Sequence, residues 1–147
     1  MYSVRDIYKT GVGPSSSHTM GPAYLAKEFI TRYPTADRVT ATLYGSLAMT
    51  GKGHGTDRAI TEMLAPVETA IVFNTEKTDL QHPNTVDFVA FQNGNEIGRM
   101  TALSIGGGDV RIVGESIHRK DGVCRILLYR NRGDLQIARH PPVRLCV

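Results

Sequence analysis

The sequence predicts an α+β domain in which helices pack on one face of a mainly antiparallel sheet. Two segments, 22–33 and 56–67, carry apolar residues every three or four positions, as helices with one buried face do. Short apolar or alternating segments dominate the later chain, and Asn93-Gly94 between two of them is a strong hairpin signal. This order of elements favours a layer of helices on a sheet.

The first helix is expected to begin at Pro22 and to end at Pro34. Proline suits the first helical position because the N–H that it lacks has no helical partner there. The buried face is marked by Ala26, Phe29, Ile30 and Tyr33. Ahead of this helix we expect a short amphipathic turn at residues 4–8 and a loop at residues 11–21.

The middle of the chain is expected to add a strand and a second helix. Residues 39–44 alternate between apolar and polar side chains, which predicts a strand with one face in the core. A glycine-rich segment, 45–55, follows it. The second helix is expected over 56–67, with Thr56 as a candidate cap. Its buried stripe consists of Ile60, Met63, Leu64 and Val67.

Beyond a polar segment at 74–85, the remaining chain is rich in predicted strands. They are expected at residues 86–91, 96–105, 110–113 and 124–129. The run Gly106-Gly107-Gly108 breaks the second of them sharply. Residues 131–147 show weak periodicity and two prolines, so no structure is assigned to them. We therefore expect one domain at 1–130, followed by a poorly matched basic tail at 131–147 that is disordered or truncated.

The composition is that of an ordinary globular domain. The chain has 147 residues, of which 41% are hydrophobic and 21% charged. The net charge of +3 is only mildly basic and the arginines are not interleaved with aromatic residues, so nucleic-acid binding is not expected. There is no signal peptide and no long apolar run, so we expect a cytoplasmic protein without a membrane span.

The two cysteines limit the metal chemistry that this chain can support. Cys124 and Cys146 form no CxxC pair and no cluster-binding run. An iron–sulfur cluster needs four such ligands, so this chain by itself cannot hold one. The histidines His18 and His54 lack a histidine or carboxylate four residues later on a helix, so a zinc site is not expected.

The first candidate site is the segment Ser15-Ser16-Ser17-His18-Thr19, just before a helix start. Backbone N–H groups at a helix start favour anions, and the hydroxyls can donate further hydrogen bonds to a carboxylate. The imidazole of His18 adds a proton carrier near neutral pH. The site could therefore hold a small amino acid. The plainer alternative, a polar and capped helix start, is favoured on composition alone.

The second candidate is the segment 51–57, where three glycines surround His54. Glycines let the backbone approach a ligand closely. Asp57 could orient His54 or could simply favour the start of the next helix. Lys52 does not belong to a phosphate-binding P-loop, because it is followed by Gly53. A turn with a solvated histidine is as good an explanation as a functional site.

Two weaker candidates lie further along the chain. In His82-Pro83-Asn84, the proline keeps His82 extended, and the histidine and asparagine could read the polar groups of an amino acid. A surface turn is the favoured explanation there. The run 104–108 ends a strand and exposes amide donors, which can build an anion site. As a lone glycine run it is a weak signal.

Two long motifs resemble the signatures of the iron–sulfur-dependent L-serine dehydratase β domain. They are residues 11–22, GVGPSSSHTMGP, and residues 45–57, GSLAMTGKGHGTD. The segments 82–84 and 104–108 follow in the order expected for the family. The resemblance runs from about residue 3 to about residue 108. The β domain of this family is also similar in fold to the allosteric substrate-binding domain of some phosphoglycerate dehydrogenases.

The resemblance implies an L-serine ammonia-lyase that converts L-serine to pyruvate and ammonia. In this family a [4Fe-4S] cluster sits in an α domain, either fused behind the β domain or on a separate chain. One iron acts as a Lewis acid on the serine hydroxyl. The chain is therefore expected to work with an α domain or chain, to be inactive alone, and to form a homo-oligomer.

The resemblance also implies roles for individual residues, and no metal ligand is among them. His54 is expected to be the base that removes the α proton, or its close partner, and His18 is the second candidate catalytic residue. The expected substrate contacts are Ser15, Ser16, Ser17, Thr19 and Asp57. A further effector or substrate contact is expected at His82, Asn84, Gly106 and Gly107.

The chain also departs from the family pattern. The cluster cysteines of the α domain are absent, and the match fades after Gly108. One alternative therefore stays open: a non-catalytic, regulatory module that binds L-serine or another small anion. That alternative needs only the loops and the pair His82 and Asn84.

Overall fold

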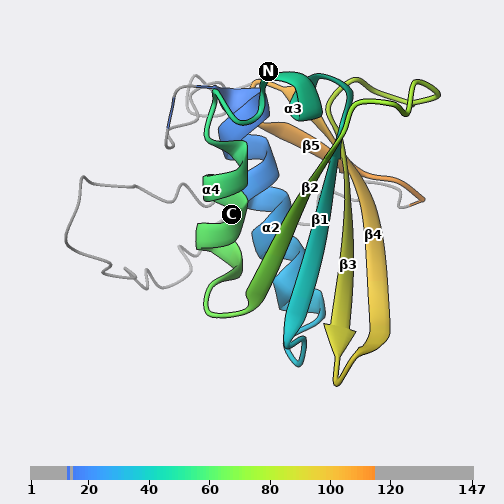
Figure 1. The fold of residues 1–147 in the computed structure, drawn as a ribbon. Coiled ribbons are helices and arrows are strands. Elements are labelled where there is room, and N and C mark those ends of the chain that lie inside the picture. The colour runs from blue at the N-terminus through green and yellow to red at the C-terminus, as the bar shows by residue number, and fades with distance from the viewer. Residues whose placement is uncertain (1–12, 14, 115–147) are drawn as a thin grey trace, which may run out of the picture.

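The computed structural model describes residue 13 and residues 15–114, and it forms one sheet covered by helices on one face (Figure 1). The helical elements are η1 (Ser16–Met20), α2 (Gly21–Arg32), α3 (Gly45–Thr50) and α4 (Thr56–Leu64). The strands are β1 (Arg38–Tyr44), β2 (Glu68–Asn74), β3 (Thr85–Gln92), β4 (Asn95–Gly106) and β5 (Asp109–Ile112). The predicted α+β class, with helices on one face, is confirmed.

The five strands lie in the order β2-β1-β3-β4-β5 and form a mixed sheet that is mainly antiparallel. Three of the four pairings are antiparallel, and the hairpin between β3 and β4 turns at Asn93-Gly94 as predicted. The exception is β2, which pairs parallel to β1. No element was predicted for residues 68–73, although Ile71-Val72-Phe73 is a short apolar run of strand-forming residues.

Two expectations about the helices are wrong in detail, and one short helix was not predicted. Residues 16–20 form a π-helical turn that runs directly into α2, where a loop was expected. The glycine-rich segment contains the short helix α3. The second helix ends at Leu64 because Ala65, the residue before Pro66, is extended, as residues before proline usually are.

Thr56 was expected to cap α4, but Gly55 occupies the cap position. The hydroxyl of Thr56 is used elsewhere, as a donor to the carbonyl oxygen of His18. The expected turn at 4–8, the strand at 124–129 and the boundary at residue 130 all lie outside the described residues.

The core lies between the helices and one face of the sheet. Alternate residues of β1 are buried, namely Val39, Ala41 and Leu43. From the helical layer, Phe29 of α2 stacks on Phe88 of β3 with ring centroids 5.2 Å apart. Burial of these apolar side chains, together with Leu25, Ile60 and Leu64, holds the helices on the sheet.

The fold brings several loops to one end of the sheet, the upper end in Figure 1. β1 ends there and leads into α3, and β3 begins there after the 82–84 segment. The two segments touch, because the N–H of Ser46 donates to the carbonyl of Pro83 over 2.7 Å. η1 is joined to α3 by a hydrogen bond between His18 and Ser46. This end of the sheet therefore gathers most of the predicted site residues.

Gly98 of β4 gives a test of the packing between α2 and the sheet. A Cβ atom at this position would lie 2.1 Å from Cε1 of Tyr33, so Gly98→Ala must displace the ring. We expect a loss of about 1–3 kcal/mol in the free energy of unfolding, as for other overpacked sites, measured by denaturant titration. Gly53→Ala is the control, because its Cβ would meet nothing closer than 3.5 Å. Equal losses in the two variants would contradict the contact.

Candidate active site

The candidate site is built around the two histidines of the long motifs, which the fold brings together. His18 lies in η1 and His54 lies in the turn between α3 and α4. They are 36 positions apart in the sequence, yet their ring centroids are 4.9 Å apart, with a tilt of 37° between the planes. Both side chains are half-buried. The two sequence motifs therefore form one site.

Both ring nitrogens of His18 are hydrogen-bonded to serine hydroxyls. Nδ1 lies 2.9 Å from Oγ of Ser17, and Nε2 lies 2.9 Å from Oγ of Ser46. A hydroxyl can donate or accept, so these partners are compatible with either neutral tautomer of the ring. Burial, and secondly the nearby charge of His54, lower the pKa of His18 from its ordinary value. His18 is therefore mainly neutral at neutral pH.

His54 is held by a carbonyl group, and this fixes its tautomer. Its Nδ1 lies 3.0 Å from the carbonyl oxygen of Thr50. A carbonyl oxygen can only accept, so Nδ1 carries the hydrogen. In the neutral ring, Nε2 then carries the lone pair, and no hydrogen bond within the described residues engages it. His54 thus offers a basic nitrogen that is free to take a proton.

The serine hydroxyls surround His18 at the start of the helical segment. Oγ of Ser15 accepts a hydrogen bond from the backbone N–H of His18 over 3.2 Å, and it lies 3.4 Å from Nδ1 of that ring. Ser15, Ser16 and Ser17 are all half-buried, so their hydroxyls are accessible in part. Such a group of donors is suited to a carboxylate. Whether these residues contact substrate stays a prediction.

Thr19 and Asp57, the other predicted substrate contacts, have partners within the chain. Thr19 is buried, and its hydroxyl donates to the carbonyl oxygen of His54 over 2.9 Å. The carboxylate of Asp57 accepts from the N–H of Arg58 over 2.9 Å, in the first turn of α4. This position favours the second role considered for Asp57, stabilisation of the helix start.

His82 and Asn84 are hydrogen-bonded to each other, and Asn84 also bonds to Ser104. The N–H of Asn84 donates to Nδ1 of His82 over 3.0 Å, and its side-chain amide donates to the carbonyl of Ser104 over 3.1 Å. Asn84 is only 8% exposed. Its Oδ1 and the Oγ of Ser104 are buried without a hydrogen-bond partner in the described part of the chain. A contact of this segment with an effector or substrate stays a prediction.

The glycine run is the turn between β4 and β5. Gly106, Gly107 and Gly108 all have positive φ angles, which glycine adopts at little cost. Ser104, just ahead of the run, packs against Gly21 at the start of α2, where a Cβ atom would lie 2.0 Å from its Oγ. The segment therefore packs against the start of α2. In the described region, neither Gly106 nor Gly107 forms a hydrogen bond with His18 or His54.

Three residues of the site were missed by the sequence analysis. Ser46, Thr50 and Thr56 bond to His18 or His54, but none of them was predicted to belong to the site, and Thr56 was expected only to cap the second helix. Ser46 and Thr50 lie inside the quoted motif at 45–57, which was the available signal. Their importance could not be seen there, because it depends on how α3 folds against η1.

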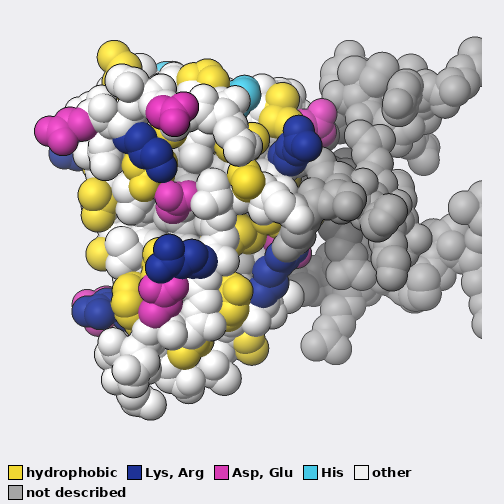
Figure 2. All heavy atoms as spheres, turned by 90° about the vertical axis from the view of Figure 1, so that its right-hand side faces the viewer, with side chains coloured by type: hydrophobic (Ala, Val, Ile, Leu, Met, Phe, Trp, Pro, Cys, Tyr) yellow, Lys and Arg dark blue, Asp and Glu magenta, His cyan; other side chains and the backbone are white. Residues whose placement is uncertain are grey.

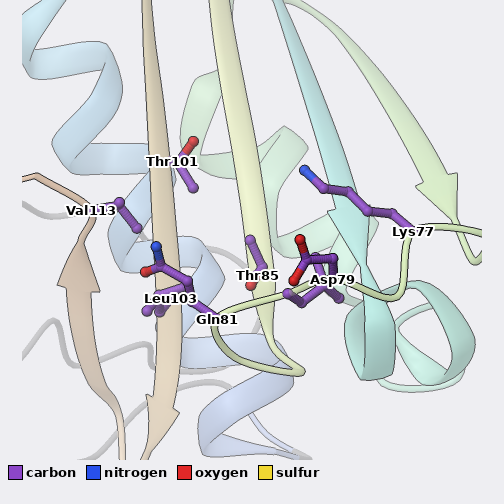
Figure 3. Close-up of a pocket in the computed structure, with 8 residues that line it drawn as sticks. Lys77, Asp79, Gln81, Thr85, Thr101, Leu103 and Val113 are labelled. Carbon is purple, nitrogen blue, oxygen red and sulfur yellow. The ribbon is translucent and has the colours of Figure 1, made fainter.

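A hollow lies on the outer face of the sheet, away from the helices, where the loop after β2 passes over β3 and β4 (Figure 3). Its lining residues are Lys77, Asp79, Leu80, Gln81, Thr85, Thr101, Leu103 and Val113. None of these was predicted as a site residue. The ammonium group of Lys77 lies 4.7 Å from the ring centroid of Tyr44 and is therefore already engaged within the chain.

The surface carries charges of both signs. Figure 2 shows Lys and Arg side chains next to Asp and Glu side chains over the outer face of the sheet, with no single basic stripe among the coloured residues. Histidine side chains are visible at its upper rim. No helix of the described residues is long and apolar enough to cross a membrane.

The lowered pKa of His18 gives a prediction for the full chain. In an NMR titration, His18 should lose its proton below the ordinary histidine pKa of about 6.5. His54→Gln should raise the pKa of His18 only part of the way back, because burial is the larger cause and remains. Because the folded pKa is depressed, the stability contributed by this group is complete above about pH 6.5 and declines as the pH falls through the folded pKa. An unshifted His18 in the unmodified chain would contradict this.

Comparison with known proteins places the chain in a family. The family model "Serine dehydratase beta chain" matches residues 3–68. L-serine dehydratase TdcG of Escherichia coli (strain K12) is 35% identical over 74% of this chain and 33% of its own length. The "Probable L-serine dehydratase, beta chain" of Bacillus subtilis (strain 168) is 36% identical over 69% of this chain and 54% of its own length.

The matched region contains both histidine motifs. L-serine dehydratase 2 of Escherichia coli (strain K12) is 54% identical over 44% of this chain, which is 16% of its own length. The chain thus spans about a third of the length of L-serine dehydratase TdcG and about half of that of the Bacillus subtilis relative. Its two histidine motifs lie within the segment matched by the family model, and this segment, residues 3–68, belongs to the serine dehydratase β-chain family.

Proposed function

We propose that this chain is the β part of an L-serine ammonia-lyase and forms pyruvate and ammonia from L-serine together with an α part. The names of the relatives support the substrate, and the name of the Bacillus subtilis relative supports the division into chains.

The observation that carries the proposal is the free Nε2 of His54. The elimination requires a base that takes the proton from the α carbon of serine, while the β hydroxyl leaves. The resulting aminoacrylate tautomerises to an imine, and water converts this to pyruvate and ammonia. A neutral imidazole with its lone pair on Nε2 is a suitable base near neutral pH. The hydrogen bond from Nδ1 to Thr50 keeps the ring in this tautomer.

His18 and the serine hydroxyls are proposed to bind and orient the substrate. The hydroxyls of Ser15, Ser16 and Ser17 lie beside His18, and their donors would hold the carboxylate of serine. With its lowered pKa, His18 is neutral, so it adds no second positive charge beside His54 when that base takes up a proton.

The [4Fe-4S] cluster is proposed to belong to the α part. Among the described residues, no group of three His, Cys, Asp or Glu could hold a metal ion. The pair of histidines is bonded to hydroxyls and a carbonyl and has no third ligand beside it. The residues described in this chain therefore do not fit the cluster.

Exposed apolar side chains on α2, α3 and β4, which begin or end at the upper end of the sheet in Figure 1, support a partner that covers this end of the domain. Met49 of α3 is 76% exposed, and it lies five positions before His54 in the sequence. Tyr24 in the first turn of α2 and Ile105 at the end of β4 are also about half exposed. Large exposed apolar side chains can mark an interaction surface. We propose that the α part docks here and closes the site.

An alternative is a regulatory module that binds L-serine or another small anion without catalysis. The hydroxyl-rich start of η1 supports this, because it needs no base. The hydrogen bond between Asn84 and His82 would then stabilise the binding loop.

The role of His54 is tested by the substitution His54→Gln in the full chain, co-expressed with a matching α part. We expect kcat for serine-dependent pyruvate formation to fall by about 100-fold or more, because the general base is lost. The matched control is Lys27→Gln, which changes an exposed residue of α2 and should leave kcat within about twofold.

Full activity in His54→Gln would remove this histidine from the mechanism. Calorimetry with L-serine then separates the two functions. Millimolar or tighter binding by the chain alone, with no activity in any combination with an α part, would favour the regulatory alternative.

A further inference from the structure

Two buried threonines join the segments that carry the histidine pair. Thr19 follows His18 in η1, and Thr56 begins α4 two positions after His54. They are 3% and 0% exposed, so neither hydroxyl faces solvent to any useful extent.

The hydrogen bonds of these threonines are reciprocal. The hydroxyl of Thr19 donates to the carbonyl oxygen of His54 over 2.9 Å, and the hydroxyl of Thr56 donates to the carbonyl oxygen of His18. Each segment therefore holds the backbone of the other segment at its histidine. A buried hydroxyl or carbonyl without a partner would be unfavourable, so the two bonds are expected to persist together.

The remaining freedom of each ring is restricted by bonds of its own. The ring of His18 is held by Ser17 and Ser46, and the ring of His54 is held by the carbonyl of Thr50. With the rings fixed on their own segments, the distance between them depends on how the segments are joined. The threonine bonds cross that junction directly.

The surroundings of Thr56 leave little room for adjustment. A Cβ atom at Gly51 would lie 3.1 Å from Oγ1 and 3.2 Å from Cβ of Thr56, so the backbone of the turn already packs against this side chain. A displacement of Thr56 would move the same turn that carries His54. The lowered pKa of His18, partly caused by His54, agrees with two rings that are kept close together.

We propose that Thr19 and Thr56 act as a reciprocal clasp that sets the distance and orientation between His18 and His54. They are positioning residues, because they act through the two histidines. Thr19 had been expected to contact substrate, but its buried hydroxyl is already used in this clasp. The part of the proposal that concerns catalysis rests on the proposed dehydratase function, whereas the part that concerns ring geometry does not.

The test compares valine and serine substitutions in the full chain. Thr19→Val and Thr56→Val keep the shape of the side chain and remove the hydroxyl, and the double variant removes both bonds. Thr19→Ser and Thr56→Ser keep the hydroxyl. Thr31→Val is the matched control, because the Thr31 hydroxyl also donates to a backbone carbonyl, that of Lys27, on an exposed face of α2.

The first measurement is the nuclear Overhauser contact between the ring protons of His18 and His54, which needs no activity. We expect it in the unmodified chain, in both serine variants and in Thr31→Val. It should weaken at least about twofold in each single valine variant and disappear in the double variant. Retention of the full contact in a folded double valine variant would overturn the proposal.

The serine variants protect the test against simple unfolding. If the valine variants do not fold, as judged by their amide NMR spectra, the serine variants decide. A ring contact within about twofold of the unmodified chain supports the clasp, and its loss despite the retained hydroxyls overturns it.

The second measurement is serine-dependent pyruvate formation with a matching α part. The valine variants should lose about tenfold in kcat with a smaller change in KM, and the serine variants should recover most of it. If the unmodified complex makes no pyruvate, the proposed dehydratase function fails, while the ring contact still tests the clasp independently.

Discussion

The parallel pairing of β1 with β2 is the constraint on which the site depends. Two parallel neighbours cannot be joined by a tight hairpin, so the chain must leave the end of β1 and return along one face of the sheet. That connection contains α3, the turn that carries His54, and α4. It begins where β1 ends, beside η1. The crossover therefore brings His54 from one long motif within ring contact of His18 from the other.

At this junction, ordinary hydrogen bonds determine the chemistry of the two imidazoles. His18 lies between two hydroxyls and is kept neutral by burial and by its neighbour, whereas His54 is fixed in one tautomer by a carbonyl. Two histidines of similar intrinsic acidity thus acquire different roles. The difference arises from the partners that the fold supplies, because the rings themselves are chemically identical.

The sequence predicted the fold class, the first helix, the β3–β4 hairpin and the two histidine motifs. These features have local signals, such as the periodicity around Phe29 and the Asn93-Gly94 turn. It did not predict β2, and the parallel pairing of β2 with β1 has no local signal because it joins residues that lie 30 positions apart in the chain. It also placed Ser15–Thr19 in a loop, since the continuation of the helix backward into a π-turn depends on tertiary contacts, such as that between Gly21 and Ser104.

The partners of the histidines were equally out of reach of the sequence. Nothing in the spacing of Thr19 and Thr56 reveals that each bonds to the other's segment, and Asn84 gives no sign that its amide turns inward to Ser104. The resemblance to a family located the motifs, but the distances within the site come only from the fold.

The tautomer of the neutral His54 ring tests the central claim most directly. Long-range proton–nitrogen correlation spectra of the full chain, recorded with the ring neutral, distinguish the two neutral tautomers. The geometry requires the hydrogen on Nδ1, bonded to the carbonyl of Thr50, and a lone pair on Nε2. A neutral His54 with its hydrogen on Nε2 would contradict the account, because the nitrogen proposed to act as the base would then have no lone pair.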